Sequence, residues 1–154
     1  MENNAIAVRP ANDRDIPAMA HLMNELGYPT STGDMLMRYR RIACNPLYST
    51  LVAEVGGHVV GMTGMLAGQY YEKNAAYIRI AVFVIDSPYR NQGIGKCLLQ
   101  CAEEWAKEKG AGVIVLNSGN RPERENAHQF YRKQGYQVQS TGFVKEIAET
   151  RSVR

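Results

Sequence analysis

The chain has 154 residues, a net charge of +3, 45% hydrophobic residues and 21% charged residues. This length suits one domain with its own core, and the composition is typical of a globular protein rather than a disordered one. No apolar run approaches the roughly 20 residues of a membrane span, and the N-terminus lacks a signal-peptide pattern. Three cysteines without zinc-type spacing argue against a disulfide framework or a metal site. We expect a cytoplasmic protein without bound metal.

The first half of the chain predicts a strand over IAVRP, two helices and a β-hairpin. Asn, Asp and Ser favour helix starts, Gly favours helix ends, and a Gly-Gly pair favours the tight turn of a hairpin. These signals lie at Asn12–Asp13 and Gly27 for the first helix, at Ser31–Thr32 and about Ala43 for the second, and at Gly56–Gly57 for the hairpin.

Basic residues gather in the second predicted helix, in the stretch RYRR from Arg38 to Arg41. Such a cluster is typical of a solvated helix face, and the alternative is attraction of an anionic ligand or partner. The remaining Lys and Arg residues are dispersed, which argues against nucleic-acid binding.

The second half predicts a buried central strand, AYIRIAVFVI, whose near-continuous apolar character suits a strand covered on both faces. An amphipathic helix follows and stops at Gly110, then come a strand, GVIVLN, and a short helix, ENAHQFYRKQ, that ends at Gly135. The stretch YQVQSTGFVKEI predicts one or two final strands. The order indicates one mixed α/β domain with a largely antiparallel front half.

Two glycines, Gly93 and Gly95, lie where the amphipathic helix begins. A helix N-terminus leaves N–H groups unpaired, and glycine lets an anion approach them closely. A dinucleotide fingerprint requires a third glycine where Leu98 stands, and a P-loop requires Gly at Arg90 and Ser or Thr at Cys97, so both motifs are excluded. These residues alone are compatible both with a tight turn that binds no ligand and with an anion-binding site.

The pattern Arg-x-x-Gly-x-Gly, from Arg90 to Gly95, resembles the acyl-CoA-binding motif of the GNAT superfamily of N-acetyltransferases. The resemblance implies that backbone amides of the turn hold the pyrophosphate of acetyl-CoA, and that the preceding strand pairs with the pantetheine arm and offers an N–H to the oxyanion. It also implies a GNAT-like fold over residues 1–148, with a mixed, mostly antiparallel sheet of six to seven strands, four helices and a tail at 149–154. The implied donor-binding residues are Phe83, Val84, Ile85, Arg90, Asn91, Gln92, Gly93, Ile94, Gly95 and Lys96.

A second motif lies downstream, in AHQFYRKQGY. Ala127, Tyr131, Gly135 and Tyr136 match the Ala-x-x-x-Tyr-x-x-x-Gly-aromatic signature of the same family. The resemblance implies that Tyr131 protonates the departing thiolate, since an ordinary phenol has a pKa near ~10 and a thiol near ~8.5. The alternative is plain packing, because Tyr131 shares a helix face with Ala127 and Phe130.

The general base is not identified by the sequence. Many members of the family carry a glutamate on the central strand, but Arg79, Ala81 and Val82 occupy the corresponding positions here. Other titratable residues near the motifs leave several candidates open, as does a base that acts through water or an acceptor with a lowered amine pKa. These candidate residues are Glu72, His58, His128 and Asp86.

Arg124 stands where many members of the family have an asparagine that contacts CoA. The pattern R-x-x-A-H-x-F-Y resembles a subset that includes aminoalkylphosphonate N-acetyltransferases. Arg124 therefore contacts a CoA phosphate or an anionic substrate, or is a solvated residue at a helix start.

Acceptor specificity in the family comes from the loop between the first two helices and from the hairpin before the central strand, which contain Tyr28 and Tyr71 here. The resemblance implies acetyl transfer to a primary amine of a small molecule or peptide. The alternative is a CoA-binding sensor or assembly protein with weak catalysis, which the missing carboxylate favours. Family members often form homodimers through edge strands, and membrane or nucleic-acid partners are not expected.

Overall fold

The computed structural model describes residues 5–119 and 124–148. The chain divides into two compact units, Met1–Val115 and Leu116–Arg154, and each is described by itself. The predicted tail at 149–154 lies outside the described residues.

The first unit is built on a five-stranded sheet with the order β1-β2-β3-β4-β5. The first four strands pair antiparallel with their neighbours in the sequence. The predicted hairpin is confirmed, with Gly56 and Gly57 both at positive φ between β2 and β3. A helix lies between β4 and β5 in the chain. The strands are β1 (Ile6–Pro10), β2 (Tyr48–Val55), β3 (His58–Gln69), β4 (Ala76–Ile85) and β5 (Ala111–Leu116).

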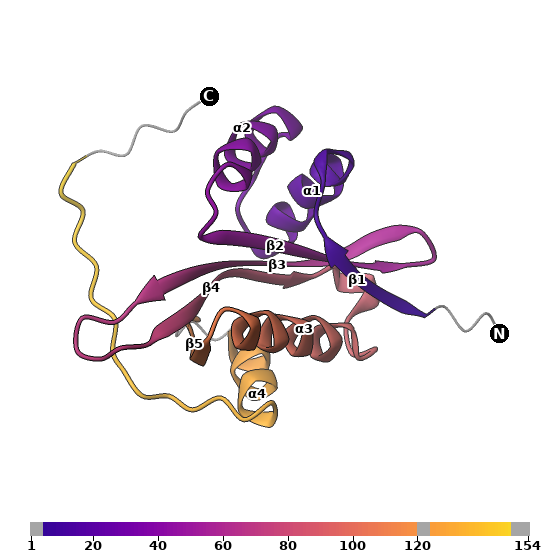
Figure 1. Ribbon diagram of the computed structural model, residues 1–154. Coiled ribbons are helices and arrows are strands. Elements are labelled where there is room, and N and C mark those ends of the chain that lie inside the picture. Colours follow the sequence, from indigo (N-terminus) through magenta and orange to yellow (C-terminus); the bar gives the residue numbers. More distant parts are fainter. Residues whose placement is uncertain (1–4, 120–123, 149–154) are drawn as a thin grey trace. The chain divides into compact units, whose positions relative to one another are not determined.

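Helices α1 (Ile16–Leu26) and α2 (Thr32–Ala43) cover one face of the sheet, and α3 (Ile94–Glu108) covers the other (Figure 1). The predicted boundaries are confirmed by local contacts. Asn12 caps the short 3₁₀ turn that precedes α1, Ser31 accepts from the N–H of Asp34 at the start of α2, and Gly27 ends α1 at φ 102°. No described helix is long and apolar enough to cross a membrane.

Each face of the sheet has its own apolar core. Met19, Leu22 and Met35 from α1 and α2 pack with Val52, Met62 and Val84 of the sheet. On the opposite face, Ile94 and Leu98 of α3 pack with Ala53 and Val60, and Phe83 and Ile85 lie against this cluster. Helix α3 therefore anchors its first turn in the core at the position where the glycine turn ends.

The second unit contains α4 (Glu125–Lys133), which is followed by Gly135 at φ 93°. The predicted final strand is wrong: residues 136–148 form no strand, so the described part of the sheet has five strands rather than six or seven. The sequence has β-forming residues there, but strand formation depends on neighbours to pair with and pack against. Val138, Phe143, Val144 and Ile147 are instead 81% to 95% exposed.

A partly buried ion-pair network joins β1, β2 and the start of α1. Arg9 donates two hydrogen bonds of 2.8 Å to Asp15 and contacts Glu54 at 2.7 Å. Asp15 is buried and also accepts from the N–H of Asn12. The hydrogen bonds from Arg9 lower the pKa of Asp15 against the opposing effect of burial.

We predict that Asp15→Asn destabilises the fold by about 1–3 kcal/mol at neutral pH, because a charge-assisted hydrogen bond is lost. The lowered pKa of Asp15 means that this stabilisation is present above the ordinary aspartate pKa of ~3.9 and is lost as pH falls through the lower, folded value. Urea denaturation of both proteins from pH 7 to pH 2 measures the difference. A gap that stays constant as the pH falls contradicts the assignment.

Candidate active site

The glycine turn lies between β4 and α3 and is shaped by two residues at positive φ. Asn91 has φ 63°, the only such value at a non-glycine residue in the described ranges, and Gly93 has φ 83° at the N-cap of α3. The N-cap residue is thus a glycine, and it gives the N-terminus of α3 no side-chain cap. A Cβ on Gly93 would meet nothing within 4 Å, so the turn requires glycine for its backbone angle and leaves open space beside it.

The other predicted donor-binding residues of the turn differ in solvent exposure. Arg90, Asn91, Gln92 and Lys96 are exposed around the turn, whereas Ile94 is 1% exposed and offers only its backbone. The Gln92 side chain donates to the carbonyl of Pro88 at 3.3 Å, which holds it against the turn. The arrangement concentrates exposed polar groups and two cationic side chains at the positive end of α3.

Contacts from α1 hold the segment that leads into the turn. Glu25 accepts a hydrogen bond of 2.7 Å from the hydroxyl of Ser87 and lies 3.7 Å from the guanidinium of Arg90. His21 donates through Nε2 to Asp86 at 3.0 Å. Arg90 also donates through Nε to the carbonyl of Ile85. We call His21, Glu25, Asp86, Ser87 and Arg90 the α1–turn cluster.

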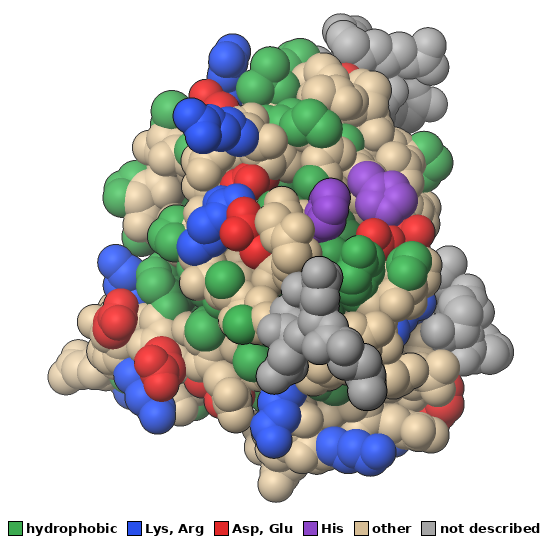
Figure 2. Space-filling model, turned by 90° about the vertical axis from the view of Figure 1, so that its right-hand side faces the viewer, with side chains coloured by type: hydrophobic (Ala, Val, Ile, Leu, Met, Phe, Trp, Pro, Cys, Tyr) green, Lys and Arg blue, Asp and Glu red, His purple; other side chains and the backbone are tan. Residues whose placement is uncertain are grey.

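Three members of the α1–turn cluster place ligand-type atoms within 4.8 Å of one another: His21, Glu25 and Asp86. Both carboxylates already have partners, and the cation of Arg90 lies beside Glu25. Acidic, basic and histidine side chains are close together on one face of the molecule (Figure 2). These contacts account for the cluster as a set of ion pairs and hydrogen bonds without a metal ion.

Strand β4 contains a bulge immediately before the segment predicted to pair with the donor. Gly64 pairs with Val82 and Met65 pairs with Ile80, which leaves Ala81 as the extra residue. Thr63 is fully buried and donates its hydroxyl to the carbonyl of Val82 at 3.0 Å. Bulges often redirect side chains beside active sites. Thr63 therefore stabilises the irregular ladder.

The segment predicted to pair with the donor, Phe83–Ile85, follows the bulge, and its side chains alternate between the two faces of the sheet. Phe83 and Ile85 lie on the α3 side and Val84 lies in the core beneath α1 and α2. On β3, Thr63 pairs with Phe83, Met62 with Val84 and Gly61 with Ile85. The side chains of this segment thus pack in the two cores, and its backbone is the part suited to contact a ligand.

Tyr131 lies on α4 in the second unit, half-buried between aromatic neighbours. Its ring contacts Phe130 at a centroid distance of 5.4 Å and Tyr136 at 6.0 Å. Burial raises the pKa of Tyr131 to about 12, and the positive charge of Arg124 opposes this shift. Arg124 is the N-cap residue of α4. The Tyr131 hydroxyl is therefore protonated throughout the neutral range.

The structure locates the candidate bases without selecting one. Asp86 is engaged by His21, and His128 donates through Nε2 to the carbonyl of Gly119 at 2.8 Å. His58 begins β3 and Glu72 lies in the turn between β3 and β4, and both are exposed. None of the four combines burial with a contact to the donor segment.

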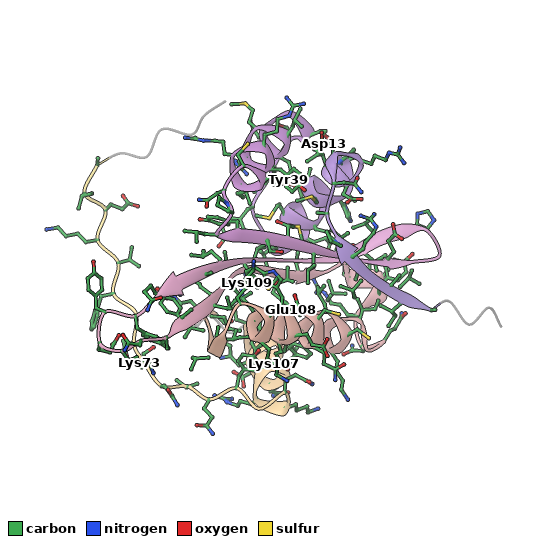
Figure 3. All side chains as sticks on the ribbon, in the orientation of Figure 1. Asp13, Tyr39, Lys73, Lys107, Glu108 and Lys109 are labelled. Carbon is green, nitrogen blue, oxygen red and sulfur yellow. The ribbon has the colours of Figure 1, made fainter. Side chains whose placement is uncertain are left out.

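The two predicted acceptor residues are exposed on different loops. Tyr28 follows α1 and is 55% exposed, and Tyr71 in the β3–β4 hairpin is fully exposed. The neighbouring Tyr70 packs against Tyr77 and lies under the ammonium of Lys73, which is labelled at the tip of this hairpin (Figure 3). The structure does not bring Tyr28 and Tyr71 into contact.

Sequence reasoning missed an apolar cavity of about 190 Å³ between α1, α2 and the sheet. Four of the seven methionines line it, together with the bulged Ala81 and the side chain of Arg38. Tyr39, labelled on α2 in Figure 3, also lines it and donates its hydroxyl to the carbonyl of Ala11 at 2.9 Å. The methionines of the cavity are Met19, Met23, Met35 and Met62.

The model of the acetyltransferase (GNAT) family matches residues 16–136. This match exceeds half of the chain and spans both the glycine turn and Tyr131. The chain belongs to the GNAT family. The resemblance inferred from the two motifs is therefore confirmed.

Relatives of this GNAT chain include an aminoalkylphosphonate N-acetyltransferase of Salmonella typhimurium (strain LT2), which is 37% identical over 92 residues. That alignment covers 59% of this chain and 58% of the relative. The chain spans about half the length of the curated relatives it matches.

Solved structures extend the similarity over nearly the whole chain. A GNAT family acetyltransferase of Staphylococcus aureus subsp. aureus USA300_TCH1516 is 34% identical, with a TM-score of 0.80 over 93% of this chain and 99% of that chain. An aminoglycoside N-acetyltransferase in complex with CoA is 14% identical, with a TM-score of 0.80 over 96% and 98% of the two chains, and shows the fold alone.

We predict that Glu25→Gln loosens the glycine turn of this GNAT chain without unfolding the protein. Ion pairs near the surface contribute about 0–1 kcal/mol, so the melting temperature changes little. The substitution weakens the contacts to Ser87 and Arg90, and amide hydrogen exchange of residues 87–93 is expected to accelerate.

Glu108→Gln is the matched control, because it removes one exposed carboxylate from the last turn of α3. Unchanged exchange in residues 87–93 of Glu25→Gln, or equal acceleration in the control, contradicts a stabilising role for the α1–turn cluster.

Proposed function

We propose that the chain is an acetyl-CoA-dependent N-acetyltransferase that moves an acetyl group to a primary amine by direct attack in a ternary complex. The observation that carries the proposal is the family match over residues 16–136, which includes an uncapped helix N-terminus behind an open glycine turn. The helix dipole and unpaired N–H groups of such a terminus favour a phosphate.

The donor site follows from this turn. Backbone N–H groups from Gln92 to Lys96 bind the pyrophosphate, with Arg90 and Asn91 beside them. Gly93 lets the phosphate oxygens approach the backbone, since no side chain fills the space next to it. The backbone from Phe83 to Ile85 pairs with the pantetheine arm, and Arg124 contacts a CoA phosphate or an anionic group of the acceptor.

The reaction needs three proton and charge events. A neutral amine attacks the thioester carbonyl, an N–H of the Phe83–Ile85 segment stabilises the oxyanion, and the C–S bond breaks with protonation of the thiolate. Tyr131 supplies that proton. Its raised pKa keeps the phenol protonated in the resting enzyme, as a general acid requires.

No carboxylate occupies the usual strand positions, because Arg79, Ala81 and Val82 stand there. We propose that the amine loses its proton through water, or that the acceptor has a lowered amine pKa. A catalytically weak CoA-binding sensor is the second candidate function, and this missing carboxylate is the observation that favours it.

The aminoalkylphosphonate relative supports an acceptor that carries both an amine and an anionic group. The three cysteines, Cys44, Cys97 and Cys101, are free thiols, which suits a reducing cytoplasm. The exposed edge strand β1 offers one place for a homodimer. Residues 1–148 form the proposed acetyltransferase domain.

Acetyl-CoA consumption across a panel of primary amines tests the proposal, with CoA release as the measurement. Tyr131→Phe is expected to lower kcat by about 10²-fold or more, because the thiolate leaves without general-acid assistance. Tyr136→Phe, which alters a neighbouring ring of the same unit, is the matched control and retains activity. Full turnover by Tyr131→Phe in an enzyme that still binds CoA rejects the catalytic assignment.

We predict that kcat/KM shows no alkaline decline from Tyr131 up to pH 10. A group with a pKa near 12 stays protonated over this range, and kcat/KM reports the free enzyme. Rates are expressed per concentration of neutral amine. A profile that is flat from pH 6 to 9 on this scale excludes a titrating protein base, whereas a decline above pH 8 contradicts the high pKa of Tyr131.

A further inference from the structure

The methionine-lined cavity lies beside the donor segment and is not part of the donor site. Ala81 and Val82 form its wall on β4, directly before Phe83. The cavity therefore continues along the same strand from the segment proposed to hold the thioester end of the donor. A molecule bound in it approaches the acetyl group from the α1 and α2 side of the sheet.

The cavity wall is almost entirely apolar. Its volume of about 190 Å³ is smaller than the ~300–1,000 Å³ of a site that encloses a whole drug-sized ligand. It suits one compact apolar side chain. The four methionines are unbranched and adaptable, so they can pack against side chains of different shapes.

Arg38 is the one charged residue of this wall. Its Nη1 donates to the hydroxyl of Thr30 at 3.2 Å, and it forms no ion pair with any described residue. A guanidinium has five N–H donors, and the contact with Thr30 uses one of them, so the others can bind an anionic ligand. The cavity thus combines an apolar interior with one cationic side chain in its wall.

The loop that contains Thr30, the contact of Arg38, is fixed by side-chain hydrogen bonds. Asn24 accepts from the N–H of Thr30 at 3.0 Å and donates to the carbonyls of Ala20 and Thr30. Thr30 is buried and donates its hydroxyl to the carbonyl of Tyr28 at 2.8 Å. A positioned guanidinium loses less freedom when it binds an anion than a mobile one.

We infer that the acceptor is a primary amine that carries a compact apolar side chain and an anionic group, with the side chain in the methionine-lined cavity and the anion on Arg38. This inference rests on the proposed acetyl transfer and names its acceptor class. The anion is a carboxylate or a phosphonate, since a guanidinium binds both bidentately. Arg38 disfavours a polycationic amine, because like charges repel.

Matched acceptors test the inference with acetyl-CoA as the donor. Leucine and methionine provide both features, leucine amide lacks the anion, glycine lacks the side chain, and the phosphonate analogue of leucine replaces the carboxylate. Leucine, methionine or the phosphonate is expected to give the highest kcat/KM. A preference for glycine, leucine amide or a polyamine overturns the inference and leaves the proposed acetyl transfer intact.

Two variants separate the two halves of the site. Arg38→Gln is expected to raise KM about 10- to 100-fold for anionic acceptors, with kcat and the KM for leucine amide unchanged. Arg41→Gln on the same helix is the control, since Arg41 is exposed and does not line the cavity. Ala81→Phe fills the cavity and is expected to raise KM for leucine and not for glycine, while Ala7→Phe on β1 is its control.

Ligand binding without the donor provides a readout independent of turnover. Leucine is expected to raise the melting temperature of the wild type and not that of Arg38→Gln. If no amine is acetylated, the proposed function fails, and the melting shift still decides whether the cavity takes this class of amine. Equal KM values in Arg38→Gln and wild type, or no melting shift with leucine, methionine or the phosphonate, overturn the inference.

Discussion

The bulge at Ala81 is the constraint on which the arrangement of the site depends. Ile78 and Ile80 pair with Ala67 and Met65 before it, and Phe83 pairs with Thr63 after it. These β3 partners alternate regularly, so they share one face, whereas the β4 residues skip one position. The bulge therefore shifts the register of β4 by one residue. After it, Phe83 and Ile85 pack in the core beneath α3, and Ala81 and Val82 line the cavity.

An extra residue in a strand leaves backbone groups without ladder partners, and this is costly where those groups are buried unless other groups replace them. Thr63 donates its side-chain hydroxyl to the carbonyl of Val82 from a fully buried position. Gly64 lies across from Val82, where a Cβ would come within 2.9 Å of the valine Cγ1. A hydroxyl and a glycine on β3 thus accommodate the irregularity on β4. The methionine-lined cavity and the segment proposed to pair with the donor both adjoin this bulge.

Local signals in the sequence predicted the helices and the hairpin, because Asn12, Ser31 and Gly27 act through neighbours in the chain. The glycine turn was predictable for the same reason, since Gly93 needs only its own φ and the helix that follows. The final strand failed because pairing depends on a distant neighbour. The bulge was hidden within an unbroken apolar run, and the contact between His21 and Asp86 joins residues 65 positions apart. The motifs located the glycine turn, whereas tertiary contacts determine how it is held and what lies beside it.

Proton transfer from Tyr131 is the remaining energetic question in the proposed mechanism. A phenol with a pKa near 12 and a thiol near ~8.5 differ by about 3.5 units, so full transfer from the resting phenol costs about 5 kcal/mol. The phenolate that forms is in turn a strong enough base to take the proton from the amine nitrogen after it has bonded to the acyl carbon, since even a free ammonium has a pKa of only ~10.4. Arg124 lowers the pKa of Tyr131 and so reduces the first cost. A tyrosine that gives its proton to the thiolate and regains one from this nitrogen returns to its resting state without a carboxylate on β4, whereas the proton that the free amine loses before it attacks goes to water. The absence of that carboxylate is therefore compatible with catalysis, provided that the positive charge at residue 124 is kept.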